Sequence, residues 1–176
     1  MLTALPDIGN TIQLLVNELI THLISQKFKA IRNKKYQMRK SRRHLKIMII
    51  EDEYDILLLY KDYLAARGHQ ILATATTTGN IIADYEMIHP DITLVDYKLP
   101  GNSSGLDLAR QILQISPTAA ILLITAYDSV TEQIVNDPTF KDKRFAVLIK
   151  PTKLRTLEST IYNLIDKDST TGLLIG

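Results

Sequence analysis

The sequence has no cysteine among its 176 residues and no run of about 18 uncharged apolar residues. The lack of cysteine excludes disulfide bonds and thiolate metal sites, and the lack of a long apolar run argues against a membrane-spanning helix. The N-terminus also lacks the basic start of a secretory signal peptide. We therefore expect a cytoplasmic protein, and its 45% apolar residues are enough for a sizeable core.

Acidic residues are scarce in the first quarter of the chain. Residues 1–45 contain nine Lys or Arg and two acidic residues, a net charge of +7, whereas residues 46–176 contain twelve and seventeen, a net charge of −5. This change predicts a domain boundary near Leu45. We expect an N-terminal segment over 1–45, one domain over 46–168 and a short tail over 169–176.

Short apolar segments alternate with amphipathic segments from residue 46 onward, which indicates strands alternating with helices. The expected strands are Lys46–Ile50, Gln70–Ala75, Ile92–Val95, Ala120–Ile124 and Phe145–Ile149. The expected helices lie within 56–65, 80–88, 106–113, 129–136 and 154–164. The pattern predicts an α/β fold, a (βα)5 doubly wound sheet of five parallel strands in the flavodoxin-like order 2-1-3-4-5.

Polar side chains stand at the ends of four expected strands. Glu51 and Asp52 follow the first strand, and Asp96 ends the third. Thr125 ends the fourth strand, and Lys150 follows the fifth. In such sheets ligands bind beyond the carboxyl ends of the strands, so we expect these five residues to share one site.

The residue types at these strand ends favour phosphoryl chemistry. Three carboxylates in a small pocket repel one another, and a hard divalent cation such as Mg²⁺ relieves that repulsion. Mg²⁺ needs only one or two of the carboxylates, which leaves Asp96 able to attack a phosphoryl donor and become an aspartyl phosphate. A threonine and a lysine are suitable groups to hold and neutralise the transferred phosphoryl group.

Four segments resemble the motifs of the response regulator receiver domain of two-component signalling, in the order IMIIEDE, TLVDYKLPG, LLITAY and VLIKP. The resemblance covers residues 46–167. It implies a phosphoprotein rather than an enzyme, with Mg²⁺ as cofactor. The phosphoryl group would come from a sensor histidine kinase or a phosphotransfer protein.

The resemblance implies a role for each matching residue. Asp96 would be the phosphoacceptor, Asp52 a direct Mg²⁺ ligand and Glu51 a Mg²⁺ ligand through water. Thr125 would bind the attached phosphoryl group, and Lys150 would pair with it. The implied metal site is therefore Glu51, Asp52 and Asp96. Pro151 resembles the family's cis-proline, whereas Lys98 and Tyr127 match positions that tune the lifetime of the phosphate.

Two features depart from the family's pattern. Val147 stands where the family usually has an aromatic switch residue, so any such switch is missing or moved, for example to Phe145 or Tyr127. The loop 102–105 is also about one residue longer than is usual in the family. We expect phosphorylation to shift 129–144 and so to alter the surface beside the last strand and the last helix. A downstream protein or a second copy would bind that surface.

Each assignment has a structural alternative. Glu51 and Asp52 could complement a helix dipole, and Asp96 could cap the loop before Pro100. Thr125 could be an ordinary strand residue, and Lys150 a solvated charge. The four histidines, His22, His44, His69 and His89, lack metal-ligand spacing, so we expect structural or surface roles for them.

The N-terminal segment admits several interpretations. An apolar stripe at helical spacing consists of Ile12, Leu15, Val16, Leu19, Leu23 and Ile24. It precedes nine basic residues within 27–43, among which there is no acid. The segment could pack on a partner or its twin, contact nucleic acid or an anionic membrane, or be a poorly ordered tail. Met38 could also be the true start of the chain.

Two other functions compete with a stand-alone receiver. The basic segment could serve as the output of a DNA-binding regulator, although no helix-turn-helix follows Asp168. A haloacid-dehalogenase-like phosphohydrolase would also form an aspartyl phosphate. It would need a second aspartate two residues after the nucleophile, and Lys98 occupies that position.

Overall fold

The structure is a computed structural model that describes residues 17–29, 43–75, 80–101, 104–166 and 174–175. The chain divides into two units, residues 1–43 and 44–176. Several residues discussed above lie outside the described ones: Ile12, Leu15, Val16, Met38, the first two residues of the loop 102–105, and most of the basic run, at 30–42. No helix among the described residues is both long and apolar enough to cross a membrane.

The described part of the first unit is a single helix over residues 17–29. Every residue of this helix is exposed. Its apolar side chains include Leu19, Ile20, Leu23, Ile24 and Phe28.

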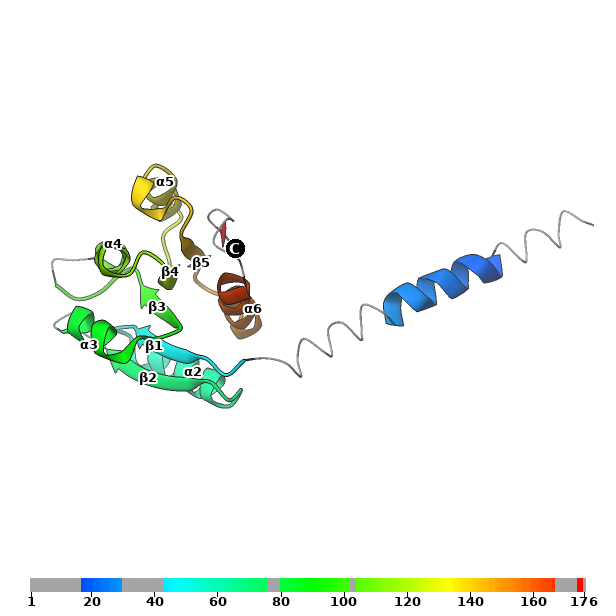
Figure 1. The fold of residues 1–176 in the computed structure, drawn as a ribbon, viewed down its shortest axis with the longest axis horizontal. Helices are drawn as coiled ribbons and strands as arrows, with labels where there is room; N and C mark the ends of the chain where they lie inside the picture. The colour runs from blue at the N-terminus through cyan, green and yellow to red at the C-terminus, as the bar shows by residue number, and fades with distance from the viewer. Residues whose placement is uncertain (1–16, 30–42, 76–79, 102–103, 167–173, 176) are drawn as a thin grey trace, which may run out of the picture. The chain divides into compact units, whose positions relative to one another are not determined.

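The second unit is built on a parallel sheet in the order β2-β1-β3-β4-β5-β6 (Figure 1). Its strands are β1 (Lys46–Ile50), β2 (Gln70–Ala75), β3 (Ile92–Asp96), β4 (Ala120–Thr125), β5 (Arg144–Ile149) and β6 (Leu174–Ile175). The predicted α/β fold, with five parallel strands in the order 2-1-3-4-5, is confirmed. The two-residue β6 is an addition, because it pairs with β5 from within the expected tail.

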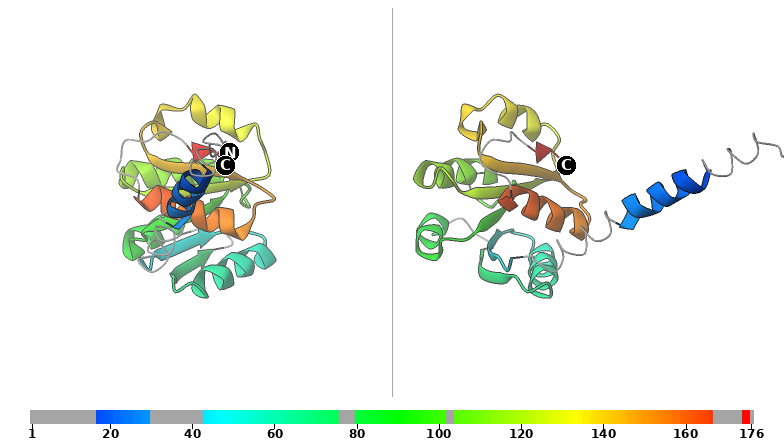
Figure 2. Two further views of the ribbon diagram at one scale, coloured as in Figure 1. Left: turned by 90° about the vertical axis from the view of Figure 1, so that its right-hand side faces the viewer. Right: turned by 45° about the vertical axis from the view of Figure 1, so that its right-hand side comes forward.

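Among the described residues of this unit, five helices and one short 3-10 helix connect the strands. They are α2 (Tyr54–Ala65), α3 (Ile81–Ile88), α4 (Gly105–Ile115), α5 (Val130–Val135), η1 (Pro138–Phe140) and α6 (Leu154–Asp166). Apolar residues of α2 and α6 pack on one face of the sheet. Those of α3, α4, α5 and η1 pack on the other face, so the sheet lies between two helical layers (Figure 2).

The alternation of side chains along each strand explains the two cores. In β3, Leu94 belongs to the core beneath α2 and α6, whereas Val95 belongs to the opposite core. Both faces are covered, so the central strands β3 and β4 are buried along their whole length. This burial is the reason that they read as continuous apolar runs rather than as alternating patterns.

A close backbone approach fixes the start of α4 against the end of β3. The Gly105 N–H donates to the Tyr97 carbonyl oxygen at 2.8 Å. A Cβ at Gly105 would lie 1.9 Å from the Asp96 carbonyl oxygen, so no larger residue fits without a shift of the chain. Ser104 and Asp107 form a capping box on the same turn.

Candidate functional site

The carboxyl edge of the sheet brings the predicted acidic residues together. One carboxylate oxygen from each of Glu51, Asp52 and Asp96 lies within 4.8 Å of the other two, an arrangement that could hold a metal ion. Glu51 and Asp96 are buried, and Asp52 is the least buried of the three. The strand order explains this meeting, because β1 and β3 are neighbours in the sheet although Glu51 and Asp96 are 45 positions apart in the sequence.

Lys150 enters the same cluster from the end of β5. Its Nζ lies 2.7 Å from Asp96 Oδ1 and 3.0 Å from Glu51 Oε2, so one ammonium bridges two carboxylates. The exposed Glu53 lies further away, at 4.0 Å from the same atom. The structure therefore places an ion-paired lysine directly beside the predicted phosphoacceptor.

Both carboxylate oxygens of Asp96 have partners. Oδ1 pairs with Lys150, and Oδ2 accepts a hydrogen bond of 2.7 Å from the Lys98 backbone N–H. Asp96 is only 5% exposed. These contacts hold its carboxylate in one orientation at the end of the strand.

Thr125 is buried at the end of β4. Its hydroxyl oxygen accepts a hydrogen bond of 3.0 Å from the Tyr127 N–H, and its carbonyl oxygen accepts one of 2.7 Å from the Lys150 N–H. Thr125 is thus connected to both the loop after β4 and the lysine of the cluster. The peptide bond between Lys150 and Pro151 is cis, as the resemblance implied.

Burial governs the charges in this cluster. It raises the pKa of Asp96 and of Glu51, because the single Lys150 ammonium that they share only partly offsets the loss of water. Burial alone would lower the pKa of Lys150, but its hydrogen bonds to Asp96 and Glu51 outweigh that effect and raise the pKa to about 12. The cluster thus holds the charged Lys150 ammonium between Asp96 and Glu51, whose negative charge is disfavoured by burial. A second cation would stabilise that negative charge.

The aromatic residues near the site differ in their surroundings. Phe145 is buried and packs on Phe140, with 4.4 Å between ring centroids, so it is a core residue. Val147 is fully buried as well. Tyr127 is 46% exposed and meets the ring of Tyr97 edge-on at 5.9 Å. Of the two residues proposed as a relocated switch, only Tyr127 lies at the surface.

Sequence reasoning did not single out Tyr97. Its ring is partly buried against the core beneath α3 and α4, and its N–H donates to the Ile124 carbonyl oxygen at 2.8 Å. The only sequence feature that could have pointed to Tyr97 was its position directly after Asp96. Its contact with Tyr127 depends on the neighbouring β3 and β4 and could not be read from spacing.

The described histidines take structural or surface positions. His69 is buried, and its Nδ1 accepts a hydrogen bond of 3.2 Å from the Leu45 N–H. His22, His44 and His89 are exposed. Among the described residues, the group that could hold a metal ion contains no histidine.

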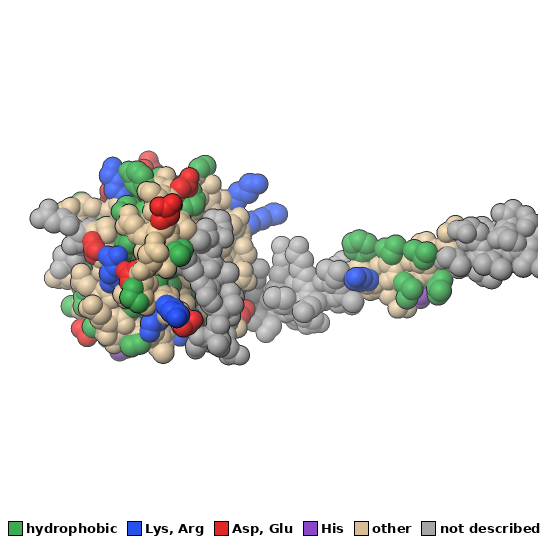
Figure 3. Space-filling model, turned by 90° about the horizontal axis from the view of Figure 1, so that it is seen from above, with side chains coloured by type: hydrophobic (Ala, Val, Ile, Leu, Met, Phe, Trp, Pro, Cys, Tyr) green, Lys and Arg blue, Asp and Glu red, His purple; other side chains and the backbone are tan. Residues whose placement is uncertain are grey.

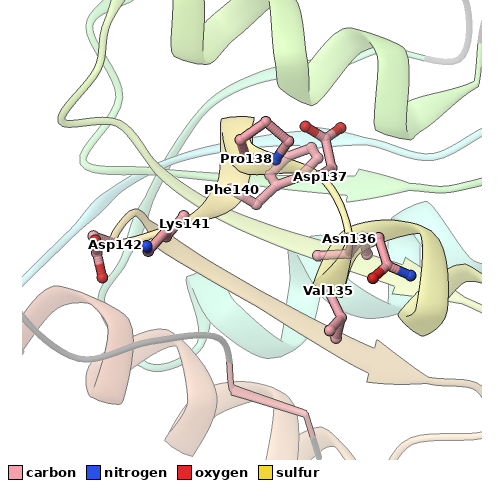
Figure 4. Close-up of a pocket in the computed structure, with 8 residues that line it drawn as sticks. Val135, Asn136, Asp137, Pro138, Phe140, Lys141 and Asp142 are labelled. Atoms are coloured by element: carbon pink, nitrogen blue, oxygen red, sulfur yellow. The ribbon is translucent and has the colours of Figure 1, made fainter.

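A separate pocket lies between α5 and the start of β5 (Figure 4). It has a volume of ≈ 330 Å³. Its lining residues are 134–138 and 140–142, and Val135, Pro138 and Phe140 supply apolar walls. None of the predicted site residues lines this pocket, so the acidic cluster remains the candidate site.

Curated relatives share part of their length with this chain. It is 26% identical to the chemotaxis protein CheY of Thermotoga maritima over 81 residues, which cover 46% of this chain and 67% of CheY. It is 30% identical to the transcriptional regulatory protein BasR of Escherichia coli over 136 residues, which cover 75% of this chain and 59% of BasR. The chain therefore spans little more than half of BasR.

Solved structures of similar fold point the same way. The anti-anti-sigma factor PhyR of Bartonella quintana has a TM-score of 0.63 at 26% identity, covering 80% of this chain and 56% of PhyR. A CheY-like receiver domain protein of Methanospirillum hungatei has a TM-score of 0.61 at 24% identity, covering 70% of this chain and 95% of its own, and shows the shared fold.

Residues 47–162 match the response regulator receiver domain family. The chain therefore belongs to the response regulator receiver domain family.

Proposed function

We propose that this protein is a phosphoacceptor whose Asp96 takes a phosphoryl group from a histidine kinase or a phosphotransfer protein. The observation that carries the proposal is the Lys150 ammonium at 2.7 Å from the Asp96 carboxylate, inside the cluster formed with Glu51 and Asp52. A carboxylate held against a fixed cation at the open edge of a parallel sheet is suited to accept an anionic group.

The proposed transfer follows from the charges. An Asp96 oxygen attacks the phosphorus, and the bond from phosphorus to the donor's nitrogen breaks, with its electron pair remaining on that nitrogen. Lys150 and the Thr125 hydroxyl would then hold the new phosphoryl oxygens. A signalling role fits this set better than catalytic turnover, so we propose no enzymatic activity on an external substrate.

The same residues fit Mg²⁺. Its preferred ligands are carboxylate oxygens combined with water and phosphate oxygens, and burial already disfavours the negative charge of Glu51 and Asp96. Glu51, Asp52 and Asp96 would hold the ion. When bound, Mg²⁺ would neutralise negative charge on the transferring group.

The test of the phosphoacceptor proposal is labelling with acetyl phosphate and Mg²⁺. We expect one acid-labile phosphoryl group per chain, detected by intact mass, and its loss in Asp96→Asn. Glu86→Gln is the matched control, because Glu86 is an exposed carboxylate on α3. Full labelling of Asp96→Asn would refute the assignment of Asp96.

We propose that output follows from a movement of the loop after β4. Attachment of phosphate adds close to two negative charges and would draw the Thr125 hydroxyl toward them. Its hydrogen bond to the Tyr127 N–H would carry Tyr127 along and shift α5 and η1. The surface of β4, α5, β5 and α6 would then bind a downstream protein or a second copy. Amide exchange with beryllofluoride should show changes between Ala126 and Arg144, and changes confined to the Asp96 loop would refute this output.

A further inference from the structure

The helix over residues 17–29 exposes a broad apolar face. The five apolar side chains Leu19, Ile20, Leu23, Ile24 and Phe28 are between 49% and 69% exposed. At about 100° per residue they occupy one half of the helix, where apolar side chains gather in the space-filling view (Figure 3). The other half carries polar residues such as Thr21, Ser25 and Lys29, whereas Lys27 lies within the apolar half, in the last turn, where its long side chain can reach the headgroup region. An exposed apolar face of this kind indicates a binding surface.

Positive charge accumulates at the C-terminal end of this helix. Glu18 is its only acidic residue, whereas Lys27 and Lys29 lie in its last turn and are exposed. The sequence continues with seven more Lys or Arg and no acid up to Arg43. A partner must therefore offer apolar contacts and dense negative charge side by side.

We propose that the helix 17–29 binds the surface of an anionic lipid bilayer and lies in the plane of the interface. The acyl region of a bilayer would cover the five apolar side chains, and anionic headgroups would neutralise the lysines. Nucleic acid would satisfy the charge but leave the apolar half in water. A second copy would cover the apolar half but would bring two strongly basic segments together.

The proposal is independent of phosphorylation at Asp96. The helix belongs to residues 1–43, and the acidic cluster belongs to residues 44–176. Failure of either proposal would leave the other standing. Binding to lipid through the helix 17–29 would localise the receiver domain at a membrane.

The experiment is flotation of the full chain with vesicles, either phosphatidylcholine alone or an equimolar mixture with phosphatidylglycerol. We expect binding to the anionic vesicles, weak binding to the neutral ones, and loss of binding at high salt. A basic residue near an anionic surface strengthens binding by a factor of about five. The double substitution Lys27→Glu with Lys29→Glu removes two such residues and should therefore weaken binding to the anionic vesicles at least about 25-fold. Leu19→Ser with Leu23→Ser should weaken it about 100-fold or more.

The control is Thr21→Gln with Ser25→Gln, which alters the polar half of the same helix and should bind as the unaltered chain does. Equal binding to neutral vesicles, or unchanged binding by the two leucine substitutions, would overturn the proposal. The proposal would also be overturned if the chain bound single-stranded RNA tightly and did not bind vesicles, and if the leucine substitutions left the RNA binding unchanged. That result would indicate a nucleic-acid role. A dimer that dissociates on the leucine substitutions, again with vesicles unbound, would show that a second copy covers the face.

Discussion

Two carboxylates share the ammonium of Lys150, and the sharing makes the acidic residues unequal. Glu51 Oε2 lies 3.0 Å from Lys150 Nζ, and its other oxygen lies 3.3 Å from the same atom and accepts a hydrogen bond of 3.4 Å from the Glu53 N–H. Asp52 is more open to solvent than Glu51 or Asp96. A metal ion can therefore coordinate the Asp52 carboxylate directly, whereas it must compete with the Lys150 ammonium for the Glu51 carboxylate.

This inequality leads to a prediction about Mg²⁺. Asp52→Ala should weaken Mg²⁺ binding at least about tenfold, and Glu51→Ala should weaken it less. Isothermal titration calorimetry in metal-free buffer measures both constants. Glu53→Ala is the control, because Glu53 is exposed and 4.0 Å from Lys150, and it should change the affinity little. An equal or larger loss at Glu51 would contradict direct coordination by Asp52.

The raised pKa values of Glu51 and Asp96 predict a pH dependence of stability. A group whose pKa is raised by folding binds its proton more tightly in the folded state. Its stabilising contribution is complete below its ordinary pKa, 4.5 for Glu51 and 3.8 for Asp96, and is lost as the pH rises through the raised value. In EDTA the contribution of these two groups to the free energy of unfolding should therefore fall as the pH rises from their ordinary pKa values, 4.5 and 3.8, through the raised ones.

Urea unfolding across pH, with EDTA or with Mg²⁺, tests this slope. Mg²⁺ should remove it, and Asp96→Asn should reduce it in EDTA. Asp107 and Asp137 act in the opposite sense. Hydrogen bonds from Ser104 lower the pKa of Asp107. Burial alone would raise the pKa of Asp137, but its contacts with Arg110 and Thr139 together outweigh burial and lower it. Their contribution is present above 3.8 and is lost in more acidic solution. The same rise of stability between about pH 5 and about pH 7 in both buffers would contradict the prediction.

At the scale of single elements, α4 and α5 begin in different ways. The Ser104 hydroxyl oxygen accepts a hydrogen bond of 3.2 Å from the Asp107 N–H, and Asp107 Oδ2 accepts one of 3.0 Å from the Ser104 N–H. Ser129 occupies the corresponding position of α5, but its side chain forms no capping hydrogen bond. One serine thus stabilises its helix start and the other does not.

The difference makes the two serines a matched pair. Ser104→Ala should lower the free energy of unfolding by about 1 kcal/mol, the usual effect of losing a cap. Ser129→Ala should change it by less than about 0.5 kcal/mol. Chemical denaturation of both variants provides the comparison, and equal losses would show that the capping box adds no stability.

At the scale of the whole molecule, the chain is made of two units that differ in how far their apolar residues are buried. The apolar residues of the sheet and its helices form two cores, and every described residue in them belongs to 44–176. The helix over 17–29 leaves its apolar residues exposed. The second unit is therefore expected to be stable by itself.

A chain beginning at His44 tests this independence. It should unfold within about 2 °C of the full chain in a thermal melt followed by circular dichroism. It should also accept phosphate from acetyl phosphate to the same extent, and it should not float with anionic vesicles. A drop of the midpoint by more than about 5 °C would show that residues 1–43 contribute to the core.

The sequence by itself determined the fold class and the strand order. Buried parallel strands must be apolar on both faces, so β1, β3, β4 and β5 are visible as short continuous runs. The polar residues Glu51, Asp96, Thr125 and Lys150 interrupt these runs only at their ends. Strand order then places these ends at one edge, which is why the candidate site could be predicted without coordinates.

Only the tertiary structure decided how side chains from different strands meet. Lys150 bridges Glu51 and Asp96, Tyr97 meets Tyr127, and Phe145 packs on Phe140. These contacts depend on the pairing of neighbouring strands and on side-chain direction, which local periodicity does not encode. The pairing of β6 with β5 also escaped prediction, because two residues are too few to show a period.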